Sequence, residues 1–409
     1  MILLPNTRME PAEDITAPLP RLLLNVQTSH GSAAVADSVP PEDYDAWMGC
    51  FEGKALDHRY YEIVHESLRK QFDHHYLLLK DREGRTRAVQ PFLIVNQDLV
   101  TGTPAVVRKL VNWIRKYIPG FLNLRMLMVG CSAGEGELAR DIGSQGVGWT
   151  VEALRHSLRP VARKLKTMLI VFKDFPKVYR SELDVLKSSG FTRVPSMPAT
   201  RLDLDFKDFE GYLTKRLSHS MRKNLRRKFK KSDSGLPIEW EVVTDIAPFV
   251  DEIYPLYLQT LARSQLRFEE LSKTYFCELA RRMPERARFF IWRQNGRIIA
   301  FASVLVHDGI LRDNYIGLDY SVALDYHLYF VTWRDTIIWA LKNGIHTYHS
   351  APLNYDPKYH FRMDLEPLDL YVLSAHAWLN PLFRLVLPLL EPTRYDRTIR
   401  KFANAGELW

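Results

Sequence analysis

Two distant segments of this chain share one pattern of strand, turn and strand. Residues 76–95 read YLLLKDREGRTRAVQPFLIV, and residues 289–306 read FFIWRQNGRIIAFASVLV. Each has a glycine in its polar turn, Gly84 in the first and Gly296 in the second. The dipeptide Asn295-Gly296 predicts a two-residue hairpin turn, because both central positions of such a turn need positive φ. We therefore predict that the chain contains two copies of one structural unit.

The segments that follow the two hairpins are also alike. In each copy a strand, a helix and another strand are predicted, at residues 124–129, 151–166 and 168–172 in the first copy and 314–318, 329–342 and 346–349 in the second. A hairpin followed by a strand–helix–strand unit builds a sheet with both antiparallel and parallel pairs. The predicted fold class is therefore α/β (α+β mixed), with two tandem domains that are each a mixed β-sheet flanked by helices.

Composition along the chain predicts four regions. The first region is rich in Pro, Ala and Ser without a sustained period, which is typical of a mobile leader. The predicted regions are a leader at 1–40, a first domain at 41–205, a second domain at 206–375 and a helical extension at 376–409. The apolar stretch Trp378–Leu390 of the extension contains two prolines and Arg384. It predicts either packing against the second half or a helix that lies on a membrane surface.

Overall charge and cysteine usage restrict the class of protein. The net charge of +8 and the sequence pI near 9.2 favour an acidic partner, although a merely basic surface has the same signature. Cys50, Cys131 and Cys277 form no CxxC pair, which argues against a disulfide framework and a cysteine-rich zinc site. The N-terminal apolar runs are too short for a secretory signal, and no stretch reaches the roughly 18 apolar residues of a spanning helix. We expect a cytoplasmic protein that binds no metal and does not cross a membrane.

A strongly basic segment opens the predicted second domain, at about residues 211–231. Its cations surround an apolar row with a spacing of four residues, which predicts one helix with an apolar face. The row is Leu213, Leu217, Met221, Leu225 and Phe229. Cations in this arrangement, Arg226 and Arg227 among them, favour contact with phosphates of acyl-CoA, a nucleotide-linked sugar, tRNA or lipid headgroups. The alternative is a solvated helix that packs by its apolar edge.

Four stretches of the second half resemble a known family. They are LSHSMRKNLRRKFKK at 217–231, LYFVTWRDTIIWALKNGI at 328–345, YDPKYHFRM at 355–363 and YVLSAHAW at 371–378. Together with the predicted order of elements, they resemble tandem Fem-like proteins of the GNAT acyltransferase superfamily, which include peptidoglycan biosynthesis or recognition proteins and BioF-like acetyltransferases. In the first half, Leu186–Phe191 is similar to the GNAT tail, where a helix ends at Gly-Phe. The likeness covers roughly residues 45–400, but the family's Gly-rich stretch before Lys358 reads SAPLNYDPK here.

The resemblance implies an N-acyltransferase that moves an acyl group from acetyl-CoA or another acyl-CoA to an amine acceptor with anionic groups. An aminoacyl-tRNA donor is a variant, which would make tRNA a partner of the basic segment. Residues 143–148, GSQGVG, precede a predicted helix and resemble the GNAT consensus Q/R-x-x-G-x-G/A. Gly143, Gln145, Gly146 and Gly148 are thus either a pyrophosphate cradle or a flexible turn.

The choice of the donor-binding half stays open at this point. The second half has no glycine between Leu318 and Phe330, which argues against a second coenzyme A cradle there. The resemblance, by contrast, places substrate groups at the junction of the halves and uses the second half for this purpose.

Candidate catalytic residues follow the predicted strands of the second half. Asp319 ends one strand and is a candidate proton relay for an attacking amine, and Tyr355 is a candidate acid. The family match implies that Lys358 contacts an anionic group and that His360 and Arg362 belong to the same substrate-facing loop. An exposed polar loop is the alternative. His376 also matches the family, and a structural histidine explains it equally well.

Two further functions stay open. Gly130-Cys131-Ser132-Ala133-Gly134 fits G-x-S-x-G after a strand, which is the pattern of a hydrolase with Ser132 as its nucleophile. The predicted hairpins argue against the parallel sheet that such a hydrolase needs. The other alternative is a non-catalytic binding protein that keeps the fold without a working cofactor loop.

Overall fold

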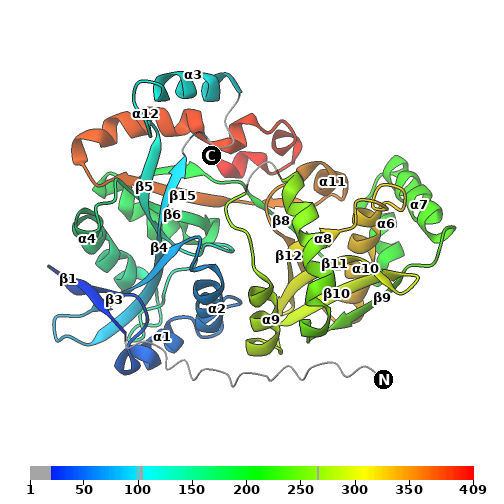
Figure 1. Cartoon of the computed structure of the whole chain (residues 1–409), viewed down its shortest axis with the longest axis horizontal. Coiled ribbons are helices and arrows are strands. Elements are labelled where there is room, and N and C mark those ends of the chain that lie inside the picture. The colour runs from blue at the N-terminus through cyan, green and yellow to red at the C-terminus, as the bar shows by residue number, and fades with distance from the viewer. Residues whose placement is uncertain (1–19, 99, 101–104, 265–266) are drawn as a thin grey trace, which may run out of the picture.

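A computed structural model describes residues 20–98, 100, 105–264 and 267–409, and these residues form two mixed sheets flanked by helices (Figure 1). One sheet belongs mainly to the first half of the chain and the other mainly to the second half. This arrangement confirms the predicted fold class. No helix within the described ranges is long and apolar enough to cross a bilayer.

The first sheet has the strand order β1-β2-β3-β4-β5-β6-β15-β7. Its strands are β1 (Leu22–Thr28), β2 (Gly31–Ala36), β3 (Asp73–Lys80), β4 (Thr86–Asp98), β5 (Asn123–Val129), β6 (Leu169–Pro176), β15 (Leu368–Ser374) and β7 (Thr192–Pro195). The second sheet has the order β14-β8-β13-β12-β11-β10-β9. Its strands are β14 (Asp364–Glu366), β8 (Ala199–Asp203), β13 (Thr347–Ser350), β12 (Ile310–Leu318), β11 (Arg297–His307), β10 (Ala287–Gln294) and β9 (Glu239–Val243).

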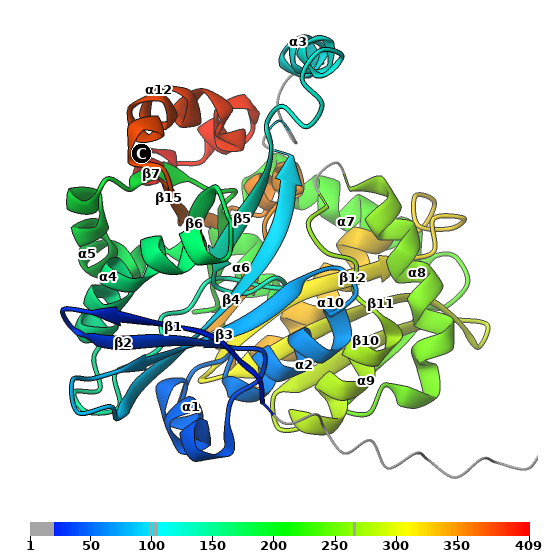
Figure 2. The same ribbon diagram turned by 60° about the vertical axis from the view of Figure 1, so that its left-hand side comes forward.

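Helices cover the sheets of both halves (Figure 2). The first half contributes α1 (Tyr44–Cys50), α2 (His58–Leu68), α3 (Ala105–Arg115), α4 (Gly148–Lys164) and the short α5 (Arg180–Leu183). The second half contributes α6 (Phe209–Arg216), α7 (His219–Asp233), α8 (Val250–Arg263), α9 (Lys273–Arg282), α10 (Leu328–Lys342), α11 (Tyr355–His360) and α12 (Asn380–Leu390).

The duplicated unit is present in both halves as predicted. Strand β3 pairs antiparallel with β4, and β10 pairs antiparallel with β11. Asn295 and Gly296 have φ of 53° and 77°, as the hairpin turn requires. Each hairpin leads into two parallel strands joined through a helix, β5 and β6 through α4 and β12 and β13 through α10. Gly190 has φ of 96° where the GNAT-like tail was predicted.

The two sheets exchange one strand each. Strand β15, from the end of the second half, lies between β6 and β7 of the first sheet and is antiparallel to both. Strand β8, from the end of the first half, lies between β13 and β14 of the second sheet. The predicted domain boundaries at 205/206 and 375/376 are therefore wrong for these two strands. Composition cannot reveal the exchange, because an apolar strand fits equally well into either sheet.

Part of the predicted leader is structured. Residues 22–36 form the hairpin β1–β2, which extends the first sheet beside β3, so the predicted limit of 40 for a mobile leader is wrong. The segment Ala33–Ala36 is buried, because α4 packs over this edge of the sheet. Gly31 is required here, since an added Cβ would lie 2.0 Å from the Lys80 carbonyl oxygen. A composition rich in small residues thus reflects close packing as well as loops.

The basic segment is two helices rather than one. Leu217 is extended, with φ of −98° and ψ of 146°, and separates α6 from α7. Ser218 begins the second helix as its N-cap, because its hydroxyl accepts a hydrogen bond from the Met221 amide at 3.4 Å. The predicted apolar row is otherwise confirmed, since Leu213, Leu225 and Phe229 are buried.

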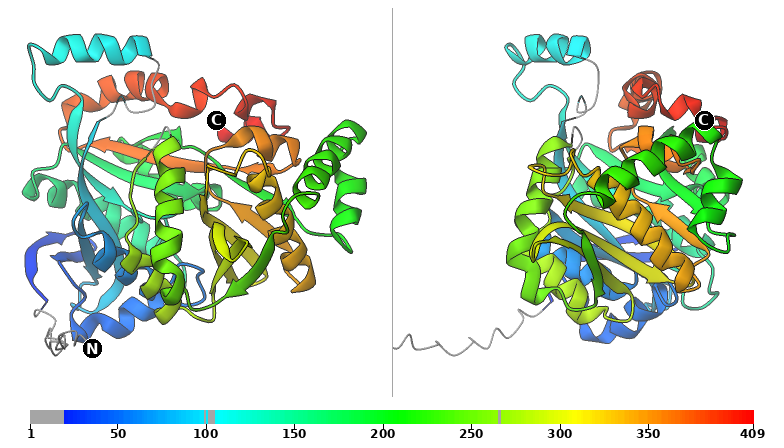
Figure 3. Two further views of the ribbon diagram at one scale, coloured as in Figure 1. Left: turned by 45° about the vertical axis from the view of Figure 1, so that its right-hand side comes forward. Right: turned by 90° about the vertical axis from the view of Figure 1, so that its right-hand side faces the viewer.

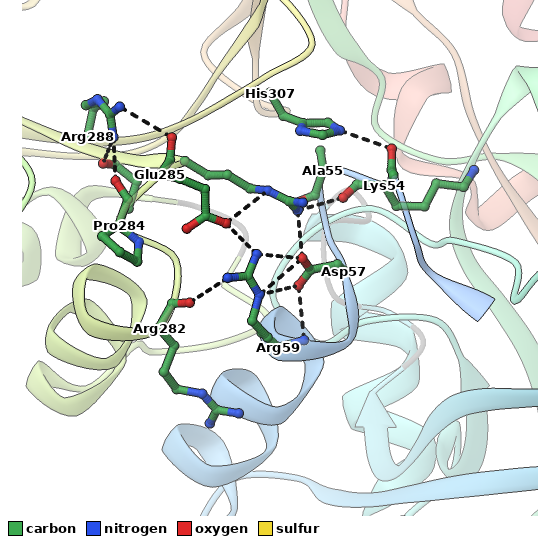
Figure 4. Close-up of polar contacts among 12 residues, drawn as sticks. Lys54, Ala55, Asp57, Arg59, Arg282, Pro284, Glu285, Arg288 and His307 are labelled. Atoms are coloured by element: carbon green, nitrogen blue, oxygen red, sulfur yellow. Dashed lines mark hydrogen bonds and ion pairs between the residues drawn. The ribbon is translucent and has the colours of Figure 1, made fainter. Parts of the chain in front are cut away.

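A polar network joins the halves (Figure 4). The guanidinium of Arg59, at the start of α2, donates to the Arg282 carbonyl at 2.8 Å and pairs with Glu285 at 2.5 Å. Arg286 of the second half pairs with Asp57 of the first half at 2.9 Å. Asp57 and Arg286 are both largely buried, so this contact fixes the relative position of the sheets.

The extension packs on the first sheet. Helix α12 contacts β7 and also β15, the strand that the second half contributes to that sheet. The later residues Ile399, Phe402 and Leu408 pack with Tyr355 and Leu365 of the second half.

Candidate active site

A cavity of about 790 Å³ lies between the two sheets. On one side it is lined by a face of the first sheet, and on the other by α8, β12 and the loop after β13. Polar side chains gather where β5 and β6 end, and most of the remaining sheet face is apolar, with Gln97 and Asp98 of β4 at its far end. The polar group consists of Ser132, Glu135, Glu137, Lys173, Asp174 and Ser196 from the first half and Arg267, Glu269, Arg312, Asn314 and His349 from the second.

Glu269 lies at the centre of this polar group. Its Oε1 accepts a hydrogen bond from the Tyr315 hydroxyl at 3.0 Å. Burial raises the pKa of Glu269, and the neighbouring Lys173 ammonium and the Tyr315 hydrogen bond offset only part of this effect. A carboxylate with a raised pKa in a cavity can accept a proton from a substrate. No motif marks Glu269 in the sequence, because it lies in a loop between α8 and α9.

Lys173 supplies the positive charge of the polar group. Its Nζ contacts the Asp174 carboxylate at 2.6 Å and lies 4.9 Å from the centre of the Phe268 ring. Asp174 has φ of 56°, an uncommon conformation for a residue other than glycine, and it also accepts a hydrogen bond from Ser196. Lys173 and Asp174 are neighbours in β6, whereas Ser196 follows β7 and meets them only in the folded chain.

His349, the third residue of β13, joins the halves through two carboxylates. Its Nε2 lies 3.0 Å from Glu135 of the first half and 3.1 Å from Glu366 of β14. Burial alone would lower the pKa of His349, but the two carboxylates outweigh burial and raise the pKa to about 9. The imidazole is therefore charged at neutral pH. The histidine in the buried strand Thr347–Ser350 was the only sequence signal for this contact.

The two halves differ where their parallel strands diverge. In the second half the pairing of β12 with β13 ends at Asp313 and Ser350, so residues 314–318 lack a partner on that side. Asn314, Ile316 and Ala351 line the cavity at this opening. In the first half the corresponding space beyond β5 and β6 is filled by the chain itself, since the Gly136 amide donates to the Asp174 carbonyl at 2.9 Å. The chain thus closes the first opening with its own backbone, although Glu135, Lys173 and Asp174 beside it also line the cavity.

The predicted pyrophosphate cradle at 143–148 already holds an anion of the protein itself. The Asp141 carboxylate accepts hydrogen bonds from the amides of Gly143 and Ser144, at 3.1 and 3.2 Å. The Gly146 amide donates to the Ser144 hydroxyl at 3.4 Å, and Gln145 has φ of 59°. None of Gly143, Gln145, Gly146 and Gly148 lines the cavity. These contacts favour a turn over a pyrophosphate cradle, although the turn is held by Asp141 and is not the flexible one of the stated alternative.

Asp319 and Tyr355, the predicted catalytic pair, are both buried in structural contacts. The Asp319 carboxylate accepts hydrogen bonds from Arg297 at 2.6 Å and from the Ser321 hydroxyl at 2.6 Å. The Tyr355 hydroxyl donates to the Pro198 carbonyl at 2.8 Å. Neither residue lines the cavity, and no contact among the described residues brings them together.

The predicted substrate-facing loop is divided between interior and surface. Lys358 is buried and donates to the Ala351 carbonyl, and burial lowers its pKa to about 7 although the nearby Asp313 acts in the opposite direction. His360 and Arg362 are exposed, and the Arg362 guanidinium lies 5.9 Å from the Tyr359 ring centre. His376 is also exposed. The structure therefore does not bring Lys358, His360 and Arg362 to one ligand.

Several cations of helix α7 lie close to the start of α10. Lys228 Nζ lies 3.2 Å from the centre of the Phe330 ring. Burial lowers the pKa of His327, the residue before α10, and the charges of Lys228, Lys231 and Arg227 lower it further. Arg226 points elsewhere, because it pairs with Glu210 at 2.7 Å beside a separate surface hollow between α6, α7 and α10. Arg227 is thus near the helix start, whereas Arg226 is not.

Ser132 has a histidine neighbour that the sequence pattern did not identify. Its hydroxyl lies 2.8 Å from His74 Nε2, and it lines the cavity. Burial lowers the pKa of His74 to about 3, assisted by His65 and His75, and its Nδ1 has no hydrogen-bond partner among the described residues. So weak a base without an orienting carboxylate does not activate a serine. The mixed first sheet also differs from the parallel sheet of such hydrolases.

One group of side chains has the composition of a metal site. Ligand atoms of His30, Glu152 and His156 lie within 4.8 Å of one another. The Arg155 guanidinium contacts the Glu152 carboxylate at 2.7 Å and His156 Nε2 at 3.2 Å. A side-chain cation thus already contacts two of the three candidate ligands.

Comparison with known proteins finds a family match in the second half of the chain. Residues 219–359 match the family model of the acetyltransferase (GNAT) domain, a range that runs from the start of α7 into α11. A protein of Mycobacterium tuberculosis whose assigned name is 8-amino-7-oxononanoate synthase 2 is 23% identical over 298 residues. The match covers 71% of this chain but only 38% of that relative.

Solved structures with a similar arrangement are distant in sequence. The L-PGS structure from Bacillus licheniformis is 13% identical, with a TM-score of 0.49 and coverage of 87% of this chain and 98% of that one. The FemX structure is 11% identical, with a TM-score of 0.48 and coverage of 85% and 98%. A tandem GNAT protein from the clavulanic acid biosynthesis pathway is 11% identical, with a TM-score of 0.39 and coverage of 75% and 83%. These likenesses are too distant to carry an argument about substrates.

Proposed function

We propose that this chain, whose residues 219–359 match the acetyltransferase (GNAT) domain, transfers an acyl group from an acyl-CoA to an amine in the cavity between its two sheets. The observation that carries the proposal is the opening between β12 and β13, which faces that cavity. A thioester in this opening would meet the polar group around Glu269, and the matching opening of the first half is filled. The second half therefore binds the donor in this proposal.

The donor's phosphates have a basic environment beside this opening. Helix α10 has 15 residues, and the dipole of such a helix favours an anion at its N-terminus. Arg227, Lys228 and Lys231 of α7 lie around the same N-terminus. The helix dipole and the side-chain cations can thus replace the missing glycine-rich loop. The GSQGVG glycines, by contrast, lie in the first half.

Glu269 is the proton acceptor in this proposal. The amine nitrogen attacks the thioester carbonyl, a C–N bond forms and the C–S bond breaks. The amine proton passes to the Glu269 carboxylate, and from there to the departing thiolate, so that charge and protons balance. Tyr315 orients the carboxylate through its 3.0 Å hydrogen bond. Arg267 and Arg312 line the same cavity and suit an acceptor that carries carboxylate or phosphate groups.

The basic residues near α10 allow a direct test. We expect the combined change Arg227→Ala, Lys228→Ala and Lys231→Ala to weaken acetyl-CoA binding by about tenfold to hundredfold, because each lost phosphate contact costs on the order of 0.5–1 kcal/mol. Calorimetry with acetyl-CoA measures this effect, and the loss should shrink at high salt. The matched control removes the same charge from Lys207, Lys215 and Lys223, which are exposed and are not among the cations near His327.

The same titration decides between donors. If the unaltered chain binds no acetyl-CoA or longer acyl-CoA, the acyl-CoA donor is rejected. Binding of an aminoacyl-tRNA in that case would support the aminoacyl variant. Absence of both would favour a non-catalytic binding protein with the GNAT fold.

A further inference from the structure

Helices α3 and α12 expose matching apolar stripes. The stripe of α3 continues one turn past the helix and consists of Val106, Leu110, Trp113 and Tyr117, with exposed fractions between 56 and 78%. The stripe of α12 begins just before the helix and consists of Trp378, Leu382, Leu385 and Leu389, with exposed fractions between 55 and 77%. Both have the spacing i, i+4, i+7, i+11, which places four large side chains on one side of a helix. A soluble surface rarely exposes such stripes unless they bind something.

The two stripes lie at the same end of the molecule. Both helices lie at the top of the views in Figures 1, 2 and 3, at the end opposite α1. A flat apolar surface placed on this end could meet both stripes at once.

The charged residues within the two segments that carry the stripes are all positive. Between Ala105 and Leu122 the chain has no acidic residue, and its cations are Arg108, Lys109, Arg115 and Lys116. Of these, Arg108, Lys109 and Lys116 are exposed, whereas Arg115 pairs with Asp98 at 2.8 Å. Between His376 and Leu390 there is again no acidic residue, and Arg384 is exposed. An apolar stripe flanked by cations complements an anionic bilayer surface.

The cavity extends to this end of the molecule. Parallel strands β5 and β6 begin here, and the pairs Met126–Leu169 and Met128–Val171 form apolar rows along the cavity. Leu370 and Val372 of β15 continue these rows, and Leu387 and Leu390 of α12 cover their near end. From Leu169 to Lys173 the strand rises about 13 Å, at about 3.3 Å per residue. An apolar arm therefore leads from α12 to the polar group.

We propose that α3 and α12 dock on an anionic lipid bilayer and that the apolar arm receives the hydrocarbon chain of a lipid-borne substrate. The headgroup or acyl carbonyl of that substrate would then reach the polar group at the ends of β5 and β6. This inference rests on the proposed acyl transfer and specifies its substrate class, an amphiphile with a long chain. It also explains why an apolar arm accompanies a site whose chemistry needs only polar groups.

Vesicle binding tests the docking surface. The full chain should cosediment with vesicles of phosphatidylcholine and phosphatidylglycerol and leave vesicles of phosphatidylcholine alone unbound, with weaker binding at high salt. The combined change Leu110→Ser, Trp113→Ser and Leu385→Ser should reduce the bound fraction by about tenfold or more, because three apolar side chains lose their burial in lipid. The control Val178→Ser with Leu324→Ser alters two exposed apolar residues outside the stripes and should bind like the unaltered chain.

Two outcomes would overturn the docking surface. One is vesicle binding that the triple change leaves unaltered while the melting temperature is also unaltered. The other is a chain that ignores anionic vesicles and instead forms a dimer that the triple change dissociates. The stripes would then bind a second copy of the chain.

A fluorescent fatty acid tests the apolar arm separately. cis-Parinaric acid should bind the unaltered chain at one saturable site, and Leu387→Trp with Leu390→Trp should weaken it by about tenfold, because the larger rings fill the arm. Acetyl-CoA binding by the same variant should persist. Failure of parinaric acid with retained acetyl-CoA binding overturns the lipid substrate and leaves acyl transfer standing, whereas loss of both in the unaltered chain overturns both proposals.

Discussion

Replacement of His349 by glutamine is expected to destabilise the chain by about 3 kcal/mol near pH 6 and to have little effect near pH 10. His349 is buried between Glu135 and Glu366, and its pKa is raised to about 9. A shift from the ordinary value of about 6.5 corresponds to about 1.36 kcal/mol for each pKa unit. Glutamine is close in volume but cannot carry the charge that compensates the two carboxylates.

The sign of the pH dependence follows from the raised pKa. The folded chain holds the His349 proton more tightly than the unfolded chain, so the stabilisation is fully present below about pH 6.5. It is lost as the pH rises through about 9, where the folded-state imidazole gives up its proton. Because Glu135 belongs to the first half and His349 to the second, this loss also weakens the contact between the halves.

Urea unfolding at a series of pH values measures the effect. The free energy of unfolding of the unaltered chain should fall between about pH 6.5 and 9 relative to the His349→Gln variant, and the two curves should converge above that range. His360→Gln is the matched control, since His360 is exposed and should leave the curve unchanged. A difference between His349→Gln and the unaltered chain that is constant from pH 6 to 10 would contradict the charged state assigned to His349.

Replacement of Glu269 by glutamine is expected to lower kcat on the order of 10²–10⁴-fold, the usual contribution of a general base. Glutamine keeps the size of the side chain and can still accept the Tyr315 hydrogen bond, but it cannot take a proton. Acyl-CoA binding should therefore be unaffected. Release of coenzyme A from an acyl-CoA in the presence of a mixture of amines measures the rate, and calorimetry measures the binding.

The pH profile separates a proton acceptor from a structural residue. The unaltered chain should lose activity as the pH falls through the raised pKa of Glu269, above the usual range of a glutamate, because the protonated carboxyl cannot accept the amine proton. The residual activity of Glu269→Gln should lack this acidic limb. Glu270→Gln is the matched control, because the neighbouring Glu270 is exposed and does not line the cavity. An unchanged kcat in Glu269→Gln would reject the assigned role.

Local patterns in the sequence predicted the repeated unit correctly. Asn295 and Gly296 adopt the two positive φ values that their dipeptide indicated, and the strands on both sides pair as a hairpin. The parallel strands and their helices also appear at the predicted positions, since both depend on neighbours in the chain. The apolar row of the basic segment is correct for the same reason. Only its break at Leu217 was missed, where the Ser218 cap begins a new helix.

Predictions about the site were less successful. A sequence motif does not show which groups of the protein itself already fill the site that the motif would form. The GSQGVG loop has the glycines of an anion cradle, yet the Asp141 side chain fills it. Asp319 and Tyr355 follow strands as functional residues often do, yet Arg297 and the Pro198 carbonyl bind them. The GNAT family model matches the second half, although that half lacks the predicted glycine cradle.

What the sequence by itself determined is the set of local units, two hairpins each followed by strand, helix and strand, because turn chemistry and apolar periodicity act between near neighbours. Only the tertiary structure decided the exchange of β8 and β15 between the sheets and the meeting of Lys173, Glu269 and His349 around one cavity. These residues come from different strands and loops of both halves. Their proximity depends on the packing of one sheet against the other, which no short stretch of the chain encodes.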